Sequence, residues 1–166
     1  HIKLIPRSKD GNAVSIDILF SSLALTHKEN VIGVILSGNL HDGTIGLKAI
    51  KDAGGITFAQ DGSAQAHSMP QSAIASGVVD FVLSPKEIAR EFIRLSKNGF
   101  LTRGAKGKQQ EDTSIEDNDP HLKTILEILH KKFNVDFSRY KMSTVRRRIQ
   151  NRMLQCHVKT IKEYAK

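Results

Sequence analysis

The stretch VIGVILSGNLHDGTIGLKAIKDAGGITFAQ, residues 31–60, decides the fold class. Residues 31–37 are a continuous apolar run, which is typical of a strand whose two faces are both covered by helices. Residues 42–55 then have a helical pattern that begins at an acidic residue and ends at a pair of glycines. Residues 56–60 are a second apolar strand. A strand, a helix and a second strand in this order predict part of a parallel sheet with crossover helices.

The same alternation continues on both sides of this stretch. The pattern predicts a helix before it and, after it, a short helix, a third strand and a helix that opens at Pro85. We expect these elements at residues 14–29, 69–77, 78–84 and 86–97. Residues 1–97 are therefore predicted to be an α/β domain that contains part of a doubly wound, three-layer parallel sheet.

The apolar pattern disappears after residue 97. Residues 98–118 are rich in Gly, Lys, Gln, Asp and Glu, a composition typical of a linker. The acidic residues before Pro120 favour the start of a new helix there. Apolar stripes at helical spacing then predict helices at 121–133 and 140–157 and the start of a third. We expect residues 119–166 to form a small all-helical domain.

The net charge of +8 is unevenly distributed along the chain. Residues 1–120 contain 13 Lys and Arg against 14 Asp and Glu, whereas residues 121–166 contain 12 against 3. The C-terminal part therefore favours a polyanionic partner.

Composition and spacing argue against several kinds of protein and site. The lone Cys156 excludes an intramolecular disulfide, and its helical surroundings predict a buried structural thiol. The seven histidines have no spacing that would place two metal ligands on one face, so no metal site is expected.

No apolar run reaches the roughly 18 residues that cross a bilayer, and the N-terminus lacks a signal-peptide pattern. We expect a cytoplasmic protein without membrane insertion.

The densest group of chemically capable residues is LSGNLHDGTIG, residues 36–46, where a strand gives way to a helix. In an open parallel sheet this position is the carboxyl edge, where ligands and catalytic groups gather. Asp42, near a helix N-terminus, suits the orienting acid of a Ser-His-Asp triad. Two alternatives stay open. Asp42 is only an N-cap while Gly38 and Gly43 permit a tight turn, or the loop binds phosphate, although it lacks both common phosphate-binding motifs.

Three runs carry a resemblance to a known family: SIDILFSSLA, then VIGVILSGNLHDGTIGLKAIKDAGGITFAQD, then MPQSAIASGVVDFVLSPKEIA. In this order and without gaps, they resemble the C-terminal half of the chemotaxis receptor methylesterase domain. The resemblance implies a doubly wound α/β esterase that hydrolyses glutamyl methyl esters on chemoreceptors through a Ser-His-Asp triad. It also implies that Asp42 is the triad acid and that Gly38, Gly43 and Met69 belong to the active-site loops.

One position departs from the family pattern, since Asn39 stands where the family usually carries a Met of the oxyanion region. Asn39 either donates a hydrogen bond to an oxyanion or merely holds the turn. The family's nucleophilic Ser and base His lie upstream of the matched region. We do not expect Ser21, Ser22, Ser37 or His41 to replace them, so the chain alone is expected to be inactive as an esterase.

Residues 133–153 resemble the N-terminal helical domain of the chemotaxis receptor methyltransferase, whose Lys-x6-Arg-x3-Arg pattern falls here on Lys141, Arg148 and Arg152. The resemblance implies that this basic helix, with Arg146 and Arg147 beside it, faces the acidic receptor helix that is methylated. It implies S-adenosylmethionine for a domain that would follow Lys166, and no cofactor for this chain.

We therefore expect part of a fused enzyme that removes and adds methyl groups on the same receptor glutamates. The alternatives are a basic nucleic-acid-binding module, which the scarcity of aromatic residues disfavours, and a non-catalytic interaction domain. The basic helix has a simpler interpretation too, as a solvated face that keeps the protein soluble. Residues 1–13 are expected to be an edge strand that invites a homodimer or a partner fragment.

Overall fold

The computed structural model describes residues 15–97, 115–116, 118–137 and 140–165. The chain divides into two compact units, His1–Arg90 and Glu91–Lys166. Each unit has its own buried apolar core. The predicted edge strand at residues 1–13, and most of the predicted linker, lie outside the described residues.

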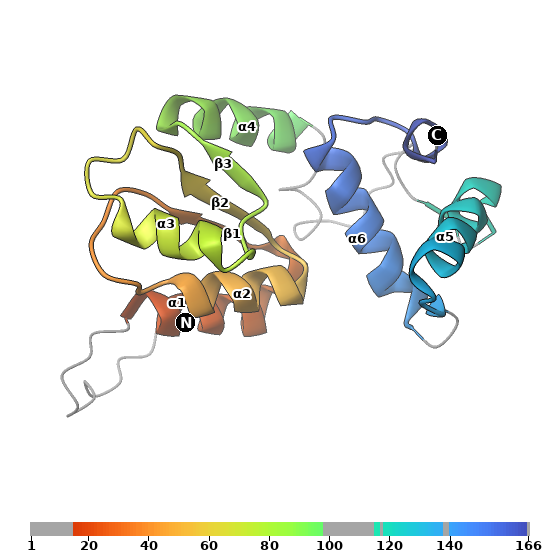
Figure 1. Cartoon of the computed structure of the whole chain (residues 1–166), viewed down its shortest axis with the longest axis horizontal. Coiled ribbons are helices and arrows are strands. Elements are labelled where there is room, and N and C mark those ends of the chain that lie inside the picture. The colour runs from red at the N-terminus through yellow and green to blue at the C-terminus, as the bar shows by residue number, and fades with distance from the viewer. Residues whose placement is uncertain (1–14, 98–114, 117, 138–139, 166) are drawn as a thin grey trace. The chain divides into compact units, whose positions relative to one another are not determined.

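The first unit is a parallel α/β arrangement, as predicted (Figure 1). Its three strands are hydrogen-bonded in the order β1-β2-β3, with Ile32 opposite Ile56 and Phe58 opposite Phe81. The elements follow one another as α1 (Ser15–His27), a 3-10 turn (Lys28–Asn30), β1 (Ile32–Ile35), α2 (Thr44–Ala53), β2 (Ile56–Gln60), α3 (Ser68–Ala75), β3 (Phe81–Leu83) and the start of α4 (Pro85–Lys97).

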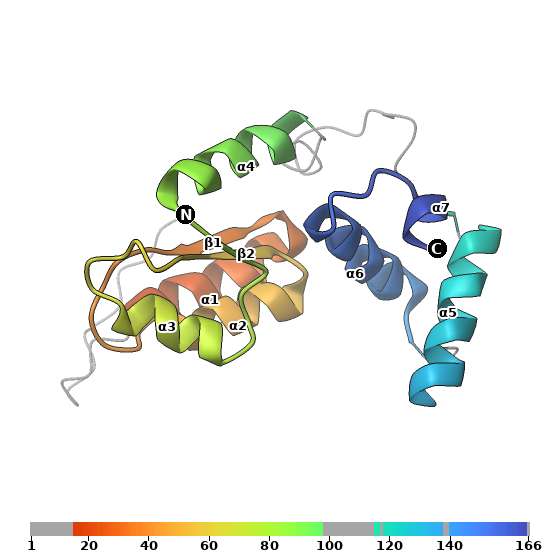
Figure 2. The same cartoon turned by 45° about the horizontal axis from the view of Figure 1, so that its top comes forward.

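Helices α1, α2 and α3 lie on one side of the sheet, and the first turns of α4 lie on the other (Figures 1 and 2). Helix α2 packs directly on β1, because a Cβ at Gly33 would lie only 2.6 Å from Leu47 Cδ2 and 2.8 Å from Ile50 Cδ1. Both of these α2 side chains are fully buried. The layers agree with the predicted three-layer α/β class.

The second unit is helical in its described part, as expected. Its core joins α5 (Pro120–Phe133), α6 (Met142–Gln155) and the short α7 (Ile161–Tyr164). Asp119 caps α5 by accepting the His121 N–H at 2.8 Å, so the predicted acidic helix start is confirmed. The buried side chains of this core are Ile115, Leu122, Ile125, Val145, Ile149 and Met153.

Two predictions for the second unit were wrong. Helix α6 begins at Met142 instead of at residue 140, because Lys141 has the extended backbone of an N-cap. Cys156, predicted to be buried, is exposed. It is the C-cap of α6 and lies beyond the stripe of Val145, Ile149 and Met153, so it does not reach the core.

Candidate functional site

The loop that follows β1 lies against the loop that follows β2, at the carboxyl edge of the sheet. The Gly38 N–H donates to the Ala66 carbonyl at 3.0 Å, and the Met69 N–H donates to the Gly38 carbonyl at 3.1 Å. Ser37 Oγ accepts the Ala66 N–H at 2.9 Å. From inside β2, buried Gln60 accepts the Ser37 N–H through Oε1. The predicted active-site residues Gly38 and Met69 are thus in contact.

Asp42 is held by two backbone donors that come from α1. Its Oδ2 accepts the Ile16 N–H at 3.0 Å, and its Oδ1 accepts the Asp17 N–H at 2.9 Å. The side chain is half-buried. Asp42 therefore does lie at a helix N-terminus, but the helix is α1 and not the helix that follows it in sequence.

The N-cap of α2 is Gly43, which makes no side-chain cap and has a left-handed backbone with φ of 97°. A Cβ at this position would lie 2.9 Å from both Ile16 Cγ2 and Ile35 Cδ1. Only glycine suits both this left-handed backbone and the lack of space for a Cβ. The turn at Gly43 directs the Asp42 carboxylate back to α1. The interpretation of Asp42 as the cap of its own helix is thereby corrected.

Asp17 makes the reverse connection, and sequence reasoning missed it. This residue is 8% exposed, and its Oδ1 accepts the Gly46 N–H from the first turn of α2 at 2.7 Å. Asp42 thus caps α1, the helix that contains Asp17, and Asp17 caps α2, the helix that begins just after Asp42. A signal was present in the sequence, because Asp17 is the only charged residue from Ile16 to Leu25.

The other residues of the loop are open to solvent. Asn39 and His41 are exposed, and Leu40 between them is 72% exposed with a left-handed φ of 72°. The exposure of Asn39 is compatible with both of its predicted roles. The Thr44 hydroxyl donates to Ser72 Oγ at 3.3 Å, which joins the start of α2 to α3.

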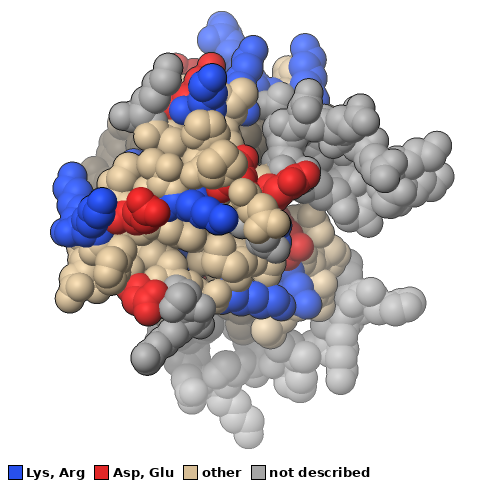
Figure 3. All heavy atoms as spheres, turned by 90° about the vertical axis from the view of Figure 1, so that its right-hand side faces the viewer, with Lys and Arg blue, Asp and Glu red and all other residues tan. Residues whose placement is uncertain are grey.

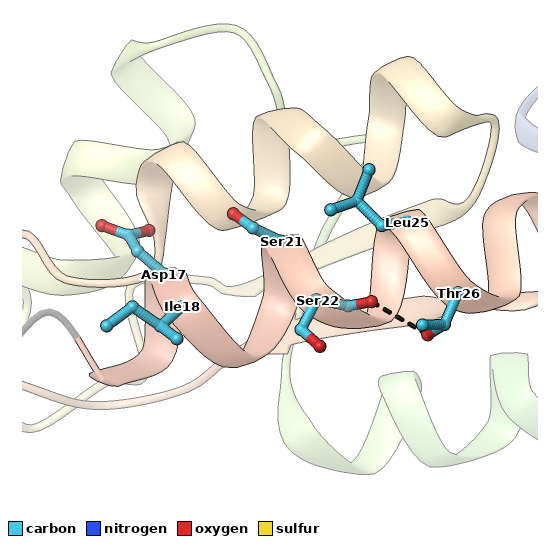
Figure 4. A pocket seen from close by; sticks show the side chains of 6 residues that line it. All are labelled: Asp17, Ile18, Ser21, Ser22, Leu25 and Thr26. Atoms are coloured by element: carbon cyan, nitrogen blue, oxygen red, sulfur yellow. Dashed lines mark hydrogen bonds between the residues drawn. The ribbon is translucent and has the colours of Figure 1, made fainter. Parts of the chain in front are cut away.

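A shallow cavity of about 450 Å³ lies along the surface of α1. Figure 4 shows Ile18 and Ser22 on one side of this helix and Ser21 and Leu25 on the other, which is also the side of the Asp17 carboxylate. The predicted site residues do not line it. Its lining consists of Asp17, Ile18, Ser21, Ser22, Leu25 and Thr26.

The five predicted receptor-binding residues differ in exposure. Lys141, at the N-cap, and Arg148 and Arg152, on α6, are exposed. Arg146 and Arg147 are half-buried, and Arg146 Nη1 donates to the Ile115 carbonyl at 3.1 Å. Arg146 therefore has a structural contact. The face in Figure 3 carries Lys and Arg side chains in several separate places, with Asp and Glu among them.

Two carboxyl groups near the ends of β2 and β3 have altered acidity. The Ser63 hydroxyl and backbone N–H donate to Asp61 and lower its pKa. The Ser84 hydroxyl and backbone N–H do the same for Glu87. Across the described ranges, no group of three or more His, Cys, Asp and Glu side chains is arranged to hold a metal ion. None of the described helices is long and apolar enough to cross a membrane.

Comparisons with known proteins agree with the division into two units. Residues 1–92 match the family model of CheB methylesterase, and residues 120–166 match that of the all-alpha domain of CheR methyltransferase. A putative protein-glutamate methylesterase/protein-glutamine glutaminase of Leptospira interrogans is 46% identical over 90 residues, which cover 54% of this chain and 47% of that protein.

A second relative extends the similarity to both units. An uncharacterised 104.1 kDa protein of Rhodobacter capsulatus is 34% identical over 170 residues, 92% of this chain but only 18% of that protein. The crystal structure of the Thermotoga maritima CheB methylesterase catalytic domain is 35% identical, with a TM-score of 0.47, and the match covers 48% of this chain and 42% of that one. The chain thus spans less than half the length of these relatives.

Proposed function

The chain belongs to the CheB methylesterase family through residues 1–92, and we propose that these residues supply the triad acid, Asp42, to an enzyme that hydrolyses glutamyl methyl esters on chemoreceptors. The observation that carries the proposal is the pair of hydrogen bonds from Ile16 and Asp17 to Asp42. A triad acid must be anionic and fixed in direction, and a helix N-terminus with two N–H donors favours both.

The Asp42 carboxylate can also accept a further hydrogen bond. A carboxylate has about four acceptor positions, and the two described hydrogen bonds use one on each oxygen. A histidine Nδ1–H can therefore still bind Asp42, which would hold the imidazole in the tautomer that activates a serine. We propose that this chain alone does not hydrolyse esters, because neither Ser37, engaged by Ala66, nor exposed His41 occupies a nucleophile-and-base arrangement with Asp42.

A chimera tests the role of Asp42. The protein-glutamate methylesterase/protein-glutamine glutaminase 3 of Geobacter metallireducens is 42% identical over 93 residues, and this matched segment can be replaced by that of the present chain. We expect the chimera to hydrolyse a methylated receptor fragment, and Asp42→Asn to lower its kcat by roughly 10⁴-fold.

The matched control is Asp52→Asn, which removes an exposed carboxylate from α2 that pairs with Lys48. Its kcat should stay within about threefold of the unsubstituted chimera, since surface ion pairs contribute little. An Asp42→Asn chimera as active as the control would leave Asp42 as a helix cap only. A chimera inactive in every form would refute esterase competence for residues 1–92.

For the second unit we propose that Lys141, Arg148 and Arg152 bind the acidic cytoplasmic helices of chemoreceptors. What supports this is their exposure, together with the match to the CheR methyltransferase all-alpha domain. Arg146 and Arg147 are less suited, because they are half-buried. The remaining expectations also belong to this proposal: a cytoplasmic enzyme, and S-adenosylmethionine as methyl donor. We propose no cofactor site for the chain itself, as the resemblance implies.

Charge-matched triple variants test the receptor surface. Replacing Lys141, Arg148 and Arg152 by Ala should weaken binding to an acidic receptor peptide by at least about tenfold at low salt. The control replaces Lys123, Lys131 and Lys132 on α5, which are also exposed and whose loss removes the same charge. Equal losses in the two triple variants would mean that net charge, and not this surface, drives binding. A parallel titration with random-sequence DNA distinguishes the nucleic-acid alternative, which predicts tight and steeply salt-dependent binding.

A further inference from the structure

We infer that Asp17 is a positioning residue for Asp42, through a double helix cap that we call the carboxylate clasp (Asp17 and Asp42). The inference deepens the proposed function and rests on it. Asp17 donates its N–H to Asp42 at 2.9 Å and accepts the Gly46 N–H at 2.7 Å. Gly46 lies only four residues after Asp42, so the hydrogen bonds and the start of α2 close a ring.

The direction of the Asp42 carboxylate depends on where α1 stands relative to α2. Both of its described donors belong to α1, 25 and 26 residues away in sequence. The loop around it contains left-handed residues on both sides, Leu40 and Gly43, so the preceding chain does not present a regular element that would orient the side chain. Any shift of α1 along α2 would therefore carry the Ile16 and Asp17 donors away.

Asp17 is the residue that prevents such a shift. Its Oδ1 fixes the first turn of α1 to the first turn of α2 by a buried hydrogen bond. The helices are also in direct backbone contact there, since a Cβ at Gly46 would lie 3.0 Å from Asp17 Cα and 2.5 Å from Phe20 Cβ. The backbone contact prevents α1 and α2 from moving closer together, and the hydrogen bond prevents them from moving apart.

The charge of Asp17 fits this role. A buried carboxylate is costly unless hydrogen bonds and a positive potential offset its desolvation. The N-terminus of α2 supplies both, as that of α1 does for Asp42. In Figure 4 the Asp17 carboxylate lies on the α2 side of α1, away from Ser22. We assign Asp17 no contact with substrate.

Amide hydrogen exchange in the chain itself tests the clasp without any need for activity. In Asp17→Ala the Ile16 amide should exchange at least about tenfold faster relative to the Ala59 amide in β2, although its own acceptor, Asp42, is unchanged. Asp17→Asn should restore the ratio to within about threefold, because its side-chain oxygen can still accept the Gly46 N–H.

The control is Asp80→Ala, at the opposite end of the sheet. The Asp80 side chain is 8% exposed, accepts the Thr57 N–H at 3.0 Å and pairs with Lys51 at 3.2 Å. Asp80→Ala therefore removes another carboxylate whose side chain is buried, and it should lower overall stability without changing the clasp. If the ratio of Ile16 to Ala59 exchange rises as much in Asp80→Ala as in Asp17→Ala, the inference is overturned.

Kinetics of the chimera decide whether the clasp serves catalysis. Asp17→Ala should lower kcat at least about tenfold with KM within about twofold, Asp17→Asn should recover most of the loss, and Asp80→Ala should change neither constant. If Asp42→Asn abolishes turnover but Asp17→Ala matches Asp80→Ala, the positioning role fails alone. If Asp42→Asn leaves kcat unchanged, the proposed function fails, and the positioning role fails with it.

Discussion

Gly46 lies in the first turn of α2, where α1 leaves no room for a side chain. An added Cβ would approach Phe20 Cβ to 2.5 Å and the Asp17 carbonyl oxygen to 3.2 Å. Alanine normally stabilises a helix by about 1 kcal/mol relative to glycine, but overpacking at a backbone contact costs about 1–3 kcal/mol. The contact is made largely by backbone and Cβ atoms, which have little freedom to move. We therefore expect overpacking to outweigh the gain in helix propensity at this position.

We expect Gly46→Ala to lower the free energy of unfolding by about 1–2 kcal/mol. Urea denaturation followed by circular dichroism measures the change. Gly62→Ala is the control, because a Cβ there meets nothing within 4 Å and should change the midpoint little. A Gly46→Ala variant as stable as Gly62→Ala would mean that α1 and α2 are free to separate.

The helix α4 begins with a capping box that makes its stability depend on pH. Ser84 Oγ and the Ser84 N–H both donate to Glu87 Oε2, at 2.7 and 3.0 Å, and Ser84 Oγ also receives the Glu87 N–H at 3.4 Å. These bonds from Ser84 lower the pKa of Glu87 below its usual 4.5. A lowered pKa in the folded state means that the box stabilises the fold above pH 4.5 and that the stabilisation is lost as pH falls through the folded value.

Glu87→Gln should therefore flatten the acid side of the stability curve. The urea midpoint of the unsubstituted chain should decrease as the pH is lowered from about 6 to about 3, and the midpoint of Glu87→Gln should decrease less. Ser84→Ala should have a similar effect, because it removes the hydroxyl that lowers the Glu87 pKa. The hypothesis fails if the three curves are parallel over this range. Asp61, whose pKa is lowered below its usual 3.8 in the same way by Ser63, is a second group whose stabilisation is lost as the pH falls.

Local sequence patterns predicted the helices and strands well, but they predicted the hydrogen-bond partners of individual side chains poorly. The limits of β2 coincide with the predicted residues 56–60, because a short apolar run there is closed by Gly55 before it and Asp61 after it. The capping partner of Asp42 was not predictable in this way. It depends on the left-handed turn at Gly43 and on donors 25 and 26 residues earlier in the chain. Arg146 illustrates the same limit, since its helical position does not reveal the Ile115 carbonyl that it binds.

At the scale of the whole molecule, the sequence places an α/β unit and a helical unit in one chain, and the Rhodobacter capsulatus relative is similar across both. The strongest signal for a further partner lies on α1. The apolar residues of this helix are not confined to a single face. Ile18, Leu19 and Leu25 are 49%, 55% and 80% exposed.

We expect these exposed side chains of α1 to cause self-association, which is a different basis for a homodimer from the edge strand predicted at residues 1–13. Light scattering across a concentration series should show mass above the 18.4 kDa of one chain, and Ile18→Lys with Leu25→Lys should return it to the monomer value. Ile45→Lys on α2 is the control, since that side chain is 69% exposed and lies outside α1. A monomer mass for the unsubstituted chain at all concentrations would refute the homodimer.

The strand register has a kinetic consequence. Ile32 pairs with Ile56 and Phe58 with Phe81, so the two pairings close loops of nearly equal length. Loop-closure entropy depends only on the logarithm of that length, so it does not decide which pairing forms first. The two closures differ in what they enclose. The first brings together β1, α2 and β2 around fully buried Leu47 and Ile50, whereas β3 is short and partly exposed. We therefore expect the sheet to nucleate at β1 and β2, with β3 the last strand to join and the first to leave.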